Sequence, residues 1–457
     1  MNIIILGAGQ VGGTLAETLA KEDYNITLVD INAERLQVLQ NRLDIRTLIG
    51  RGSEPDILRQ AGGENADMLI AVTSSDETNM IACQVAFTLY QTPTKIARIR
   101  SNSYLAYDAL FQNKAIPIDV CINPEDLVTR YVQRLIEYPG ALQVLDFADG
   151  QIQLVAVTSF VDGPLPGRKI SELRDCLPQI DLRVAAIFRG KRSIPINGDT
   201  EIKIGDEVFF ITAANKTREL LRLLGRLDNP YRRIMIGGGG HIGLRLAQAL
   251  EEQYNVKVID HNQSCAQKLA SKLNGATVLC GDICEPELLL DENIESSDVF
   301  CAVTNDDEAN IMSCIQAKRL GVRKVMALIN RTAYVDLVEG SEIDIAISPQ
   351  QATIGSILRH LRKGDVVNVH SLRRGAAEAI EVIVHGDRET SSVIGRALGE
   401  IAFPSGINVG AIARGNSTLI AHHDLVIEPD DHLILFLVDK TILKEVEKLF
   451  QVNVNFF

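Results

Sequence analysis

Residues 3–12 read IIILGAGQVG, an apolar run that passes directly into a glycine-rich turn. Gly7, Gly9 and Gly12 fit the G-x-G-x-x-G pattern of dinucleotide-binding folds, and apolar residues at helical spacing follow. In this pattern the first glycine permits a tight turn, the second lets the backbone approach a pyrophosphate, and the third lets helix and strand pack. The stretch therefore predicts a strand, a turn and a helix whose N-terminus faces an anionic group.

An acidic residue follows at the spacing that such a fold requires. The expected second strand, 25–29 NITLV, ends at Asp30, eighteen residues after Gly12. A carboxylate at this place can accept both hydroxyls of an adenosine ribose, and its charge disfavours the 2′-phosphate of NADP. The candidate contacts of a first nucleotide cleft are Gly7, Gly9, Gln10, Val11, Gly12 and Asp30.

The same pattern returns in the second half of the chain. Gly7 recurs as Gly238, 231 residues later, and the stretch 67–73, DMLIAVT, realigns at this offset with 298–304, DVFCAVT. The stretch 256–259, VKVI, is again followed directly by an acidic residue. The repetition of both signals predicts a second cleft, with candidate contacts Gly238, Gly240, His241, Ile242, Gly243 and Asp260. His241 takes the place of Gln10, so the position has no need of a titrating group and we do not assign it a catalytic role.

Each glycine-rich segment is followed by a stretch of short alternating runs. Residues 183–190, RVAAIFRG, resemble 408–415, NVGAIARG, and turn signals at 205–206 and 430–431 precede further apolar runs. Proline at 230 blocks the preceding helix and places a hinge at 226–230. We therefore expect an α/β chain of two tandem Rossmann-like domains with doubly wound parallel sheets, each followed by a small α+β module. The expected ranges are 1–135, 136–226, 227–365 and 366–457.

The two copies differ where a nucleotide would be read. Arg98 and Arg100 of the first copy stand opposite Leu328 and Asn330 of the second, and residues two apart on a strand share one face. Paired guanidinium groups match phosphate oxygens, so we hypothesise that the first cleft accepts the extra phosphate of ATP or ADP. The alternative is that these arginines form surface ion pairs.

Two further positions are ambiguous in function. The third strand ends before Arg51 in the first copy and before Asp282 in the second, which predicts different adenine edges. After the fourth strand come Thr73-Ser74 and Thr304-Asn305, at the carboxyl edge where doubly wound sheets bind ligands. These residues could contact ribose or phosphate, whereas Ser75 and Asp306 beside them could simply cap the next helix.

Composition and charge exclude several classes of function. A formal net charge of −13 without a basic run opposes binding to nucleic acid. The chain begins without a secretory signal and contains no run of about 18 to 20 apolar residues, so we expect a cytoplasmic protein that meets a membrane only through a partner. The eight cysteines lack metal-site spacing, and we expect them to be reduced, buried small hydrophobes with no bound metal.

No motif for catalysis is present. The chain contains no phosphate-binding loop ending in Gly-Lys-Ser/Thr, no His-Glu-x-x-His pair and no serine elbow. The stretch after each Rossmann segment, roughly ninety residues, is small for the substrate domain of a dehydrogenase. We therefore name no catalytic residue, and a duplicated NAD-dependent oxidoreductase is the rival interpretation. A redox-sensing transcription factor, a further rival, would need a basic recognition helix.

The residues also resemble a known family. The fingerprint GAGQVG with Asp30, the stretch 73–79, TSSDETN, and 138–142, YPGAL, are similar to RCK (KTN) domains. The doubled arrangement, down to 344–349, DIAISP, resembles the regulatory subunits of bacterial potassium uptake systems of the Trk type over essentially the whole chain. This resemblance implies NAD(H) and adenine nucleotides in the Rossmann clefts and a ligand-driven change of shape. It also implies a homo-oligomeric ring, for which we expect a tetramer, docked at the inner face of the membrane under a potassium-translocating integral membrane subunit.

Overall fold

The computed structural model describes most of the chain. The predicted hinge lies largely outside the described residues, because 226–229 are not among them. The described ranges are 1–21, 24–190, 192–225, 230–338, 341–361, 366–372, 377–404, 406–437 and 442–451.

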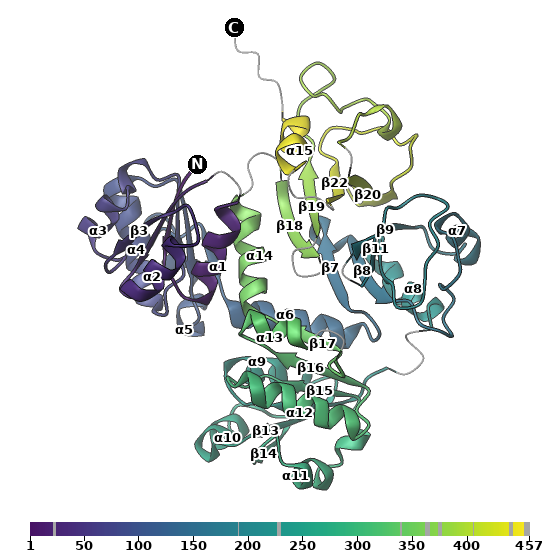
Figure 1. Cartoon of the computed structure of the whole chain (residues 1–457), viewed down its shortest axis with the longest axis horizontal. Helices are drawn as coiled ribbons and strands as arrows, with labels where there is room; N and C mark the ends of the chain where they lie inside the picture. The colour runs from purple at the N-terminus through teal and green to yellow at the C-terminus, as the bar shows by residue number, and fades with distance from the viewer. Residues whose placement is uncertain are drawn as a thin grey trace. The chain divides into compact units, whose positions relative to one another are not determined.

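The first half opens with a six-stranded, all-parallel sheet in the order β3-β2-β1-β4-β5-β6. Figure 1 draws this domain in purple, with β3 and helices α1 to α5 labelled. Its central strands are continuous apolar runs because helices pack against them. Parallel sheets are usually covered by helices on both faces, so their central strands are buried. The order changes direction between β1 and β4, which is where such sheets bind ligands. The strands are β1 Asn2–Leu6, β2 Asn25–Asp30, β3 Arg46–Ile49, β4 Met68–Ala71, β5 Thr94–Arg98 and β6 Val120–Ile122.

The helices of this domain connect the strands in the alternating βα order. Helix α4 packs on β4 and β5, and α2 packs on β2 and β3. The helices are α1 Gln10–Leu19, α2 Ala33–Gln40, α3 Pro55–Gln60, α4 Asp76–Tyr90, α5 Asn102–Leu105 and α6 Pro124–Glu137, with short 3₁₀ turns η1 Gly63–Asn65 and η2 Asp108–Phe111.

The second half repeats this topology in the sheet β14-β13-β12-β15-β16-β17. Its strands are β12 Arg233–Gly237, β13 Asn255–Asp260, β14 Thr277–Cys280, β15 Val299–Ala302, β16 Lys324–Leu328 and β17 Ile345–Ile347. Its helices are α9 His241–Leu250, α10 Gln263–Ala270, α11 Pro286–Asp291, η6 Ile294–Ser296, α12 Asp307–Arg319, α13 Thr332–Leu337 and α14 Pro349–Leu361. The predicted pair of Rossmann-like domains is confirmed.

Each Rossmann segment is followed by a five-stranded antiparallel sheet, in the orders β10-β9-β11-β8-β7 and β18-β19-β22-β20-β21. The first module contains β7 Gln143–Phe147, η3 Ala148–Gly150, β8 Ile152–Thr158, η4 Ile170–Glu172, α7 Leu173–Cys176, β9 Leu182–Arg189, β10 Arg192–Ser193, β11 Glu207–Ala213, η5 Ala214–Lys216 and α8 Thr217–Leu223. The second contains β18 Val366–Leu372, β19 Ala377–Ile383, η8 Leu398–Glu400, β20 Ile407–Arg414, β21 Ser417–Ile420, β22 His432–Leu437 and α15 Leu443–Phe450.

The two antiparallel sheets share one apolar core. Phe147, Phe188 and Phe209 of the first module are buried in the same cluster as Phe436 of the second. Phe188 and Phe209 meet edge to face, with ring centroids 5.6 Å apart. Burying these rings together joins the modules, because aromatic side chains carry the largest apolar area of any residue type.

The same ion pair fixes the turn before the last long strand of each module. Asp206 accepts hydrogen bonds from Arg189 at 2.8 Å, and Asp431 accepts them from Arg414 at 2.8 Å. Both carboxylates are fully buried. The aspartate of each turn therefore does more than favour a turn. It also forms an ion pair, because a buried charge is tolerated only when it is paired.

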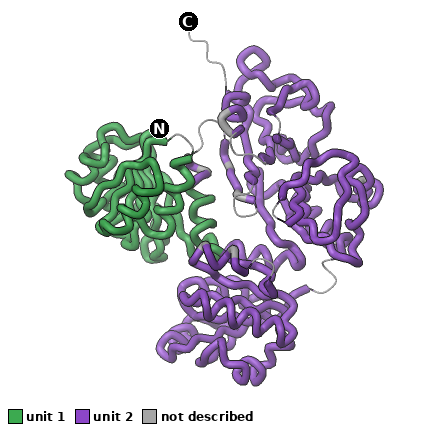
Figure 2. The backbone as a smooth tube through the Cα atoms, in the orientation of Figure 1, with its two compact units in different colours: residues 1–128, 348–357 green, residues 129–347, 358–457 purple. Residues whose placement is uncertain are grey.

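The chain divides into two compact units, shown in different colours in Figure 2. Unit 1 contains residues 1–128 and 348–357, so it takes the first turns of α14 from the second half. Unit 2 contains residues 129–347 and 358–457. The exact limits of the four expected domains stay predictions.

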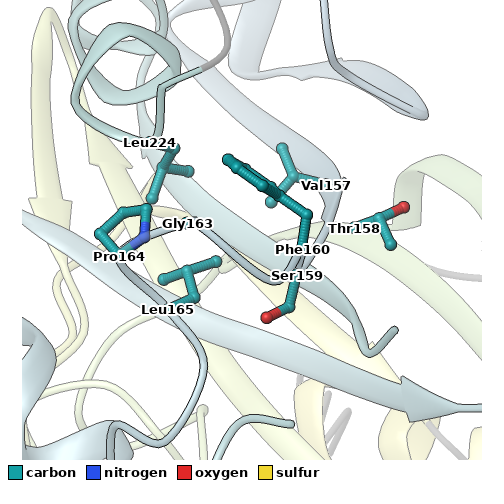
Figure 3. A pocket seen from close by; sticks show the side chains of 8 residues that line it. All are labelled: Val157, Thr158, Ser159, Phe160, Gly163, Pro164, Leu165 and Leu224. Carbon is teal, nitrogen blue, oxygen red and sulfur yellow. The ribbon is translucent and has the colours of Figure 1, made fainter. Parts of the chain in front are cut away.

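A narrow apolar hollow lies in the first module, between the end of β8 and Leu224 (Figure 3). It is too narrow to admit a water molecule. The buried Ser159 hydroxyl beside it has no hydrogen-bond partner among the described residues. The hollow is therefore a packing defect and not a ligand site.

The expectation for the cysteines is only partly right. Cys83, Cys301 and Cys314 are buried, and burial raises the pKa of the Cys301 thiol to about 12. Cys176 and Cys280, in contrast, are exposed, because they lie at the ends of a short helix and of an edge strand. All eight thiols are unpaired in the structure.

Among the described residues no helix has both the length and the apolar character needed to cross a bilayer.

Candidate functional site

The glycine-rich turns have the backbone geometry that only glycine adopts easily. Gly7 and Gly238 both have φ of +104°, in the left-handed region. A Cβ on Gly12 or Gly243 would lie 1.9 Å from the carbonyl oxygen of that first glycine, so helix and strand could not pack with any side chain there. The two turns are therefore the same structure built twice.

The N-termini of α1 and α9 are open toward the carboxyl edge of each sheet. Gly9 and Gly240 are the N-cap residues, and neither helix receives a side-chain cap. A Cβ at either glycine would meet nothing within 4 Å. Backbone N–H groups at the first turn of a helix attract anions, so both turns offer a place for a phosphate.

The acidic residue at the end of the second strand is tied to the turn. Asp30 accepts hydrogen bonds from the backbone N–H of Ala8 at 2.5 Å and of Asn32 at 2.8 Å. Asp260 accepts from Gly239 at 2.7 Å and from Asn262 at 2.8 Å. Each carboxylate therefore holds the glycine turn beside the place expected for a ribose, in addition to any contact with the ribose itself.

The segment after the fourth strand is built around a buried amide. Asn79 accepts from the backbone N–H of Thr73 at 3.0 Å and from its hydroxyl at 2.7 Å, and donates to the carbonyl of Arg98 at 2.9 Å. Asn310 makes the same bonds to Thr304 and to the carbonyl of Leu328. This amide joins the ends of two neighbouring strands at the carboxyl edge of each sheet.

The helix-capping interpretation of the adjacent residues is confirmed. Ser75 caps α4 through a hydrogen bond from Thr78 N at 3.1 Å, and Asp306 caps α12 through one from Ala309 N at 2.9 Å. Ser74 is exposed just before the first cap. Asn305 is exposed at the same place in the second copy, and contact of this segment with a nucleotide stays a prediction.

Two residues that organise this edge were missed as site residues. Asp76 accepts from the backbone N–H of Arg100 at 3.0 Å and of Ser101 at 2.8 Å, and Asp307 does the same for Asn330 and Arg331. These aspartates, and the buried asparagines three residues further on, recur at the 231-residue offset. This recurrence of polar residues in the sequence could have identified them as site residues.

The two arginines of the first copy have different environments. Arg100 forms an ion pair with Glu125 at 2.6 Å, so the ion-pair alternative is confirmed for this residue. The Nε of Arg98 is buried and has no hydrogen-bond partner in the described part of the chain. Burial, and then the neighbouring charge of Arg100, lowers the pKa of Arg98 below its ordinary value. Only Arg98 is left poised for an external anion.

The remaining sequence candidates lie at the outer edge of the clefts. Asp282 is exposed after β14 and accepts from the backbone N–H of Cys284 at 2.9 Å, while Arg51 is exposed at the same place in the first copy. Gln10 and His241 are exposed as the first residues of α1 and α9. Val11 and Ile242 follow them and are half-buried.

A residue of α14 reaches the first glycine turn. Gln350 is buried, and its amide donates to the carbonyl of Gln10 at 2.7 Å and to the hydroxyl of Thr14. Both partners belong to α1, the helix that begins at the glycine turn. A segment from the second half of the sequence therefore fixes the helix on which the first phosphate site is built.

Comparison with known families agrees with this architecture. The model of the TrkA-N domain matches residues 3–124 and 234–349, and that of the TrkA-C domain matches 154–225 and 388–451. The four matches together span most of the chain, and they fall on the two parallel and the two antiparallel sheets.

The chain is also similar to whole proteins. The Trk system potassium uptake protein TrkA of Halomonas elongata is 58% identical over 457 residues and covers 100% of both chains. TrkA of Vibrio alginolyticus is 58% identical over 452 residues, 99% of each chain, and TrkA of Haemophilus influenzae is 50% identical over 457 residues, 100% of each. The chain belongs to the TrkA family of Trk system potassium uptake proteins.

Solved structures share the fold at low sequence identity. A GsuK channel bound to NAD aligns with a TM-score of 0.62 at 17% identity and covers 98% of this chain and 78% of the channel. The isolated GsuK RCK domain aligns with a TM-score of 0.62 at 18% identity, over 98% of this chain and 94% of that one. The resemblance to RCK domains seen in the sequence is thereby confirmed for the fold.

Proposed function

We propose that this chain is a nucleotide-sensing regulatory subunit that gates a membrane potassium transporter through ligand-induced domain rearrangement. The observation that carries the proposal is the doubled glycine turn, held by an aspartate at the carboxyl edge of each parallel sheet. The TrkA relatives are named as potassium uptake proteins, and one neighbour in fold is titled as a channel bound to NAD.

The expected ligands are NAD(H) in both clefts and ATP or ADP in the first. Pyrophosphate would lie at the N-termini of α1 and α9, where N–H groups are open. Adenosine ribose would meet Asp30 in the first cleft and Asp260 in the second. The arrangement around Arg98 supports an additional phosphate in the first cleft alone.

A ligand can shift the protein between two shapes only by binding one of them more tightly. Typical coupling free energies between sites are about 1 to 3 kcal/mol, so several sites in a ring would have to act together. The hydrogen bond of Gln350 to α1 would transmit this change of shape, because a movement of α1 at the first phosphate site would displace its partner in α14. We therefore expect a homo-oligomeric ring, a tetramer, that is cytoplasmic and peripheral on the inner face of the membrane.

Binding and transport measured together test the proposal. Full-length protein should bind NADH saturably, and potassium flux through the reconstituted Trk-type membrane subunit should change when NADH is added with the protein present. The variant Asp30→Ala/Asp260→Ala should lose both effects, whereas an exposed-surface change such as Glu64→Ala should lose neither. Saturable binding without any effect on flux would refute the gating role.

The same protein distinguishes the rival interpretation. A duplicated oxidoreductase would oxidise NADH in the presence of some small substrate, and it would stay in the supernatant whether or not the membrane subunit is present. The regulatory subunit should instead sediment with membranes that contain the transporter and leave the NADH absorbance unchanged.

A further inference from the structure

A cavity of about 440 Å³ lies far from the glycine turn of the second Rossmann domain. It opens at the amino ends of β12, β15 and β16, whereas the glycine turn is at their carboxyl ends. These strands of four to five residues separate the two edges by about 15 Å. The cavity is lined by Pro230, Arg232, Arg233, Ser296, Asp298 and Arg323.

The lining carries an excess of positive charge. Three guanidinium groups face one carboxylate, a local balance of 3 − 1 = +2 in a chain whose formal charge is −13. The carboxylate of Asp298 is already engaged by the backbone N–H groups of Arg232 at 2.7 Å and Arg233 at 2.9 Å. It also accepts from Arg323 at 3.0 Å.

The three arginines are held to different degrees. Arg323 pairs with Asp298 and stacks on the buried ring of Tyr231, with 5.0 Å between guanidinium and ring centroid. Arg233 donates to the carbonyl of Ser296 at 3.3 Å. The side chain of Arg232 has no partner among the described residues and is exposed at the cavity. Two of the guanidinium groups are therefore held in place, and the third is available to bind a ligand. This arrangement suits the binding of an oxyanion.

The first Rossmann domain lacks this feature although its backbone is the same. Met1 and Asn2 stand where the second domain has Arg232 and Arg233, and Pro93, directly before β5, stands where it has Arg323, directly before β16. Asn2 bonds to the carbonyl of Asn65 at 2.9 Å, just as Arg233 bonds to Ser296. The fold therefore does not require arginine at these places.

We propose that the arginine pocket, formed by Arg232, Arg233 and Arg323, binds a phosphate group carried by a small molecule or a lipid headgroup. A phosphate monoester carries a charge of about −1.5 to −2 at neutral pH, which matches the excess charge of the pocket. Its oxygens accept paired hydrogen bonds from guanidinium groups. The cavity volume lies within the range of about 300 to 1,000 Å³ that is usual for small-molecule sites.

Calorimetric titration of the full chain with pyrophosphate tests the site, and calorimetry suits a protein without tryptophan. Pyrophosphate should bind saturably in the presence of excess NADH, and Arg232→Ala should weaken this binding at least tenfold. Arg319→Ala is the matched control, since Arg319 lies in the same domain in a 70% exposed surface pair. It should leave the affinity unchanged. Thermal midpoints of both variants show whether they are folded.

Two further arms identify the source and the chemistry. Sedimentation with vesicles that contain phosphatidic acid, whose headgroup is a phosphate monoester, would assign the phosphate to a lipid if it is lost in Arg232→Ala and absent with phosphatidylcholine alone. Pyrophosphate binding without sedimentation would assign it to a soluble molecule. Arg232→Lys should bind more weakly than the native chain and more tightly than Arg232→Ala. Succinate binding as tightly as pyrophosphate through Arg232, or pyrophosphate binding that NADH abolishes, would overturn the proposal.

Discussion

The two Rossmann domains have the same turn, the same aspartate and the same buried asparagine, yet they differ in charge at several edge positions. The interior features set where a phosphate and a ribose can lie, and they are repeated at identical offsets. The edges differ in charge: Arg98 belongs to the first copy, and the arginine pocket belongs to the second. Duplication therefore preserved the geometry of the scaffold while the two clefts diverged in what they can recognise.

The equivalence of the two glycine turns can be broken with one methyl group. Gly12→Ala places a Cβ 1.9 Å from a backbone oxygen, so the turn must shift, at a cost of about 1 to 3 kcal/mol in the free energy of unfolding. We expect loss of nucleotide binding in the first half only, measured by calorimetry and thermal unfolding. Gly243→Ala should have the same effect in the second half only. Gly9→Ala, where a Cβ would meet open space, should leave the free energy of unfolding nearly unchanged.

The difference between the clefts depends on Arg98. Arg98→Ala should weaken ATP binding to the first cleft about tenfold, because a charge-assisted contact to phosphate is lost, and should leave NADH affinity unchanged. Arg100→Ala should have a smaller effect, since that guanidinium is already paired with Glu125. Competition titrations in an Asp260→Ala background measure both. Equal ATP affinity in the background protein and in both arginine variants would contradict the hypothesis that the first cleft accepts the extra phosphate of ATP.

The helices α6 and α14 make different use of equivalent positions. Glu125 pairs with Arg100, whereas Gln350, 225 residues later, bonds to α1. Gln350→Ala should lower the stability of α1 by about 1 kcal/mol, the usual net value of a hydrogen bond. Faster amide exchange in residues 10–19 would report it, and the neighbouring Gln351→Ala is the control. Unchanged exchange would show that the contact is not a coupling element.

The smallest expected effect concerns the ion pair at the turn of the first small module. Burial raises the pKa of Asp206, but hydrogen bonds from Arg189 and from the backbone of Lys203 outweigh burial and lower it below the ordinary value. The stabilisation is therefore complete above the unfolded pKa of about 4 and is lost as pH falls through the lower, folded pKa.

Between about pH 5 and pH 3 the thermal midpoint of the native chain should therefore fall more steeply than that of Asp206→Asn. Parallel curves for the native chain and Asp206→Asn would contradict the assignment.

Much of the architecture follows from the sequence because local patterns carry it. The glycine spacing, the apolar strands and the offset of 231 residues predict two Rossmann sheets, and the structure has both. Ser75 and Asp306 are caps, as one of the two interpretations required. These features depend on residues near one another in the chain, where spacing and geometry are linked directly.

Other features depend on contacts between segments that are far apart in the chain. The sequence could not tell that Arg100 pairs with Glu125 while Arg98 does not, nor that Cys280 lies exposed at a sheet edge. It could not join Gln350 to α1 across more than three hundred residues, or gather three arginines around one cavity. Local spacing by itself determined two nucleotide-type turns in tandem. Which charges are neutralised and which stay available was decided only by tertiary packing, because the free energy of a charge depends on the groups that surround it in space.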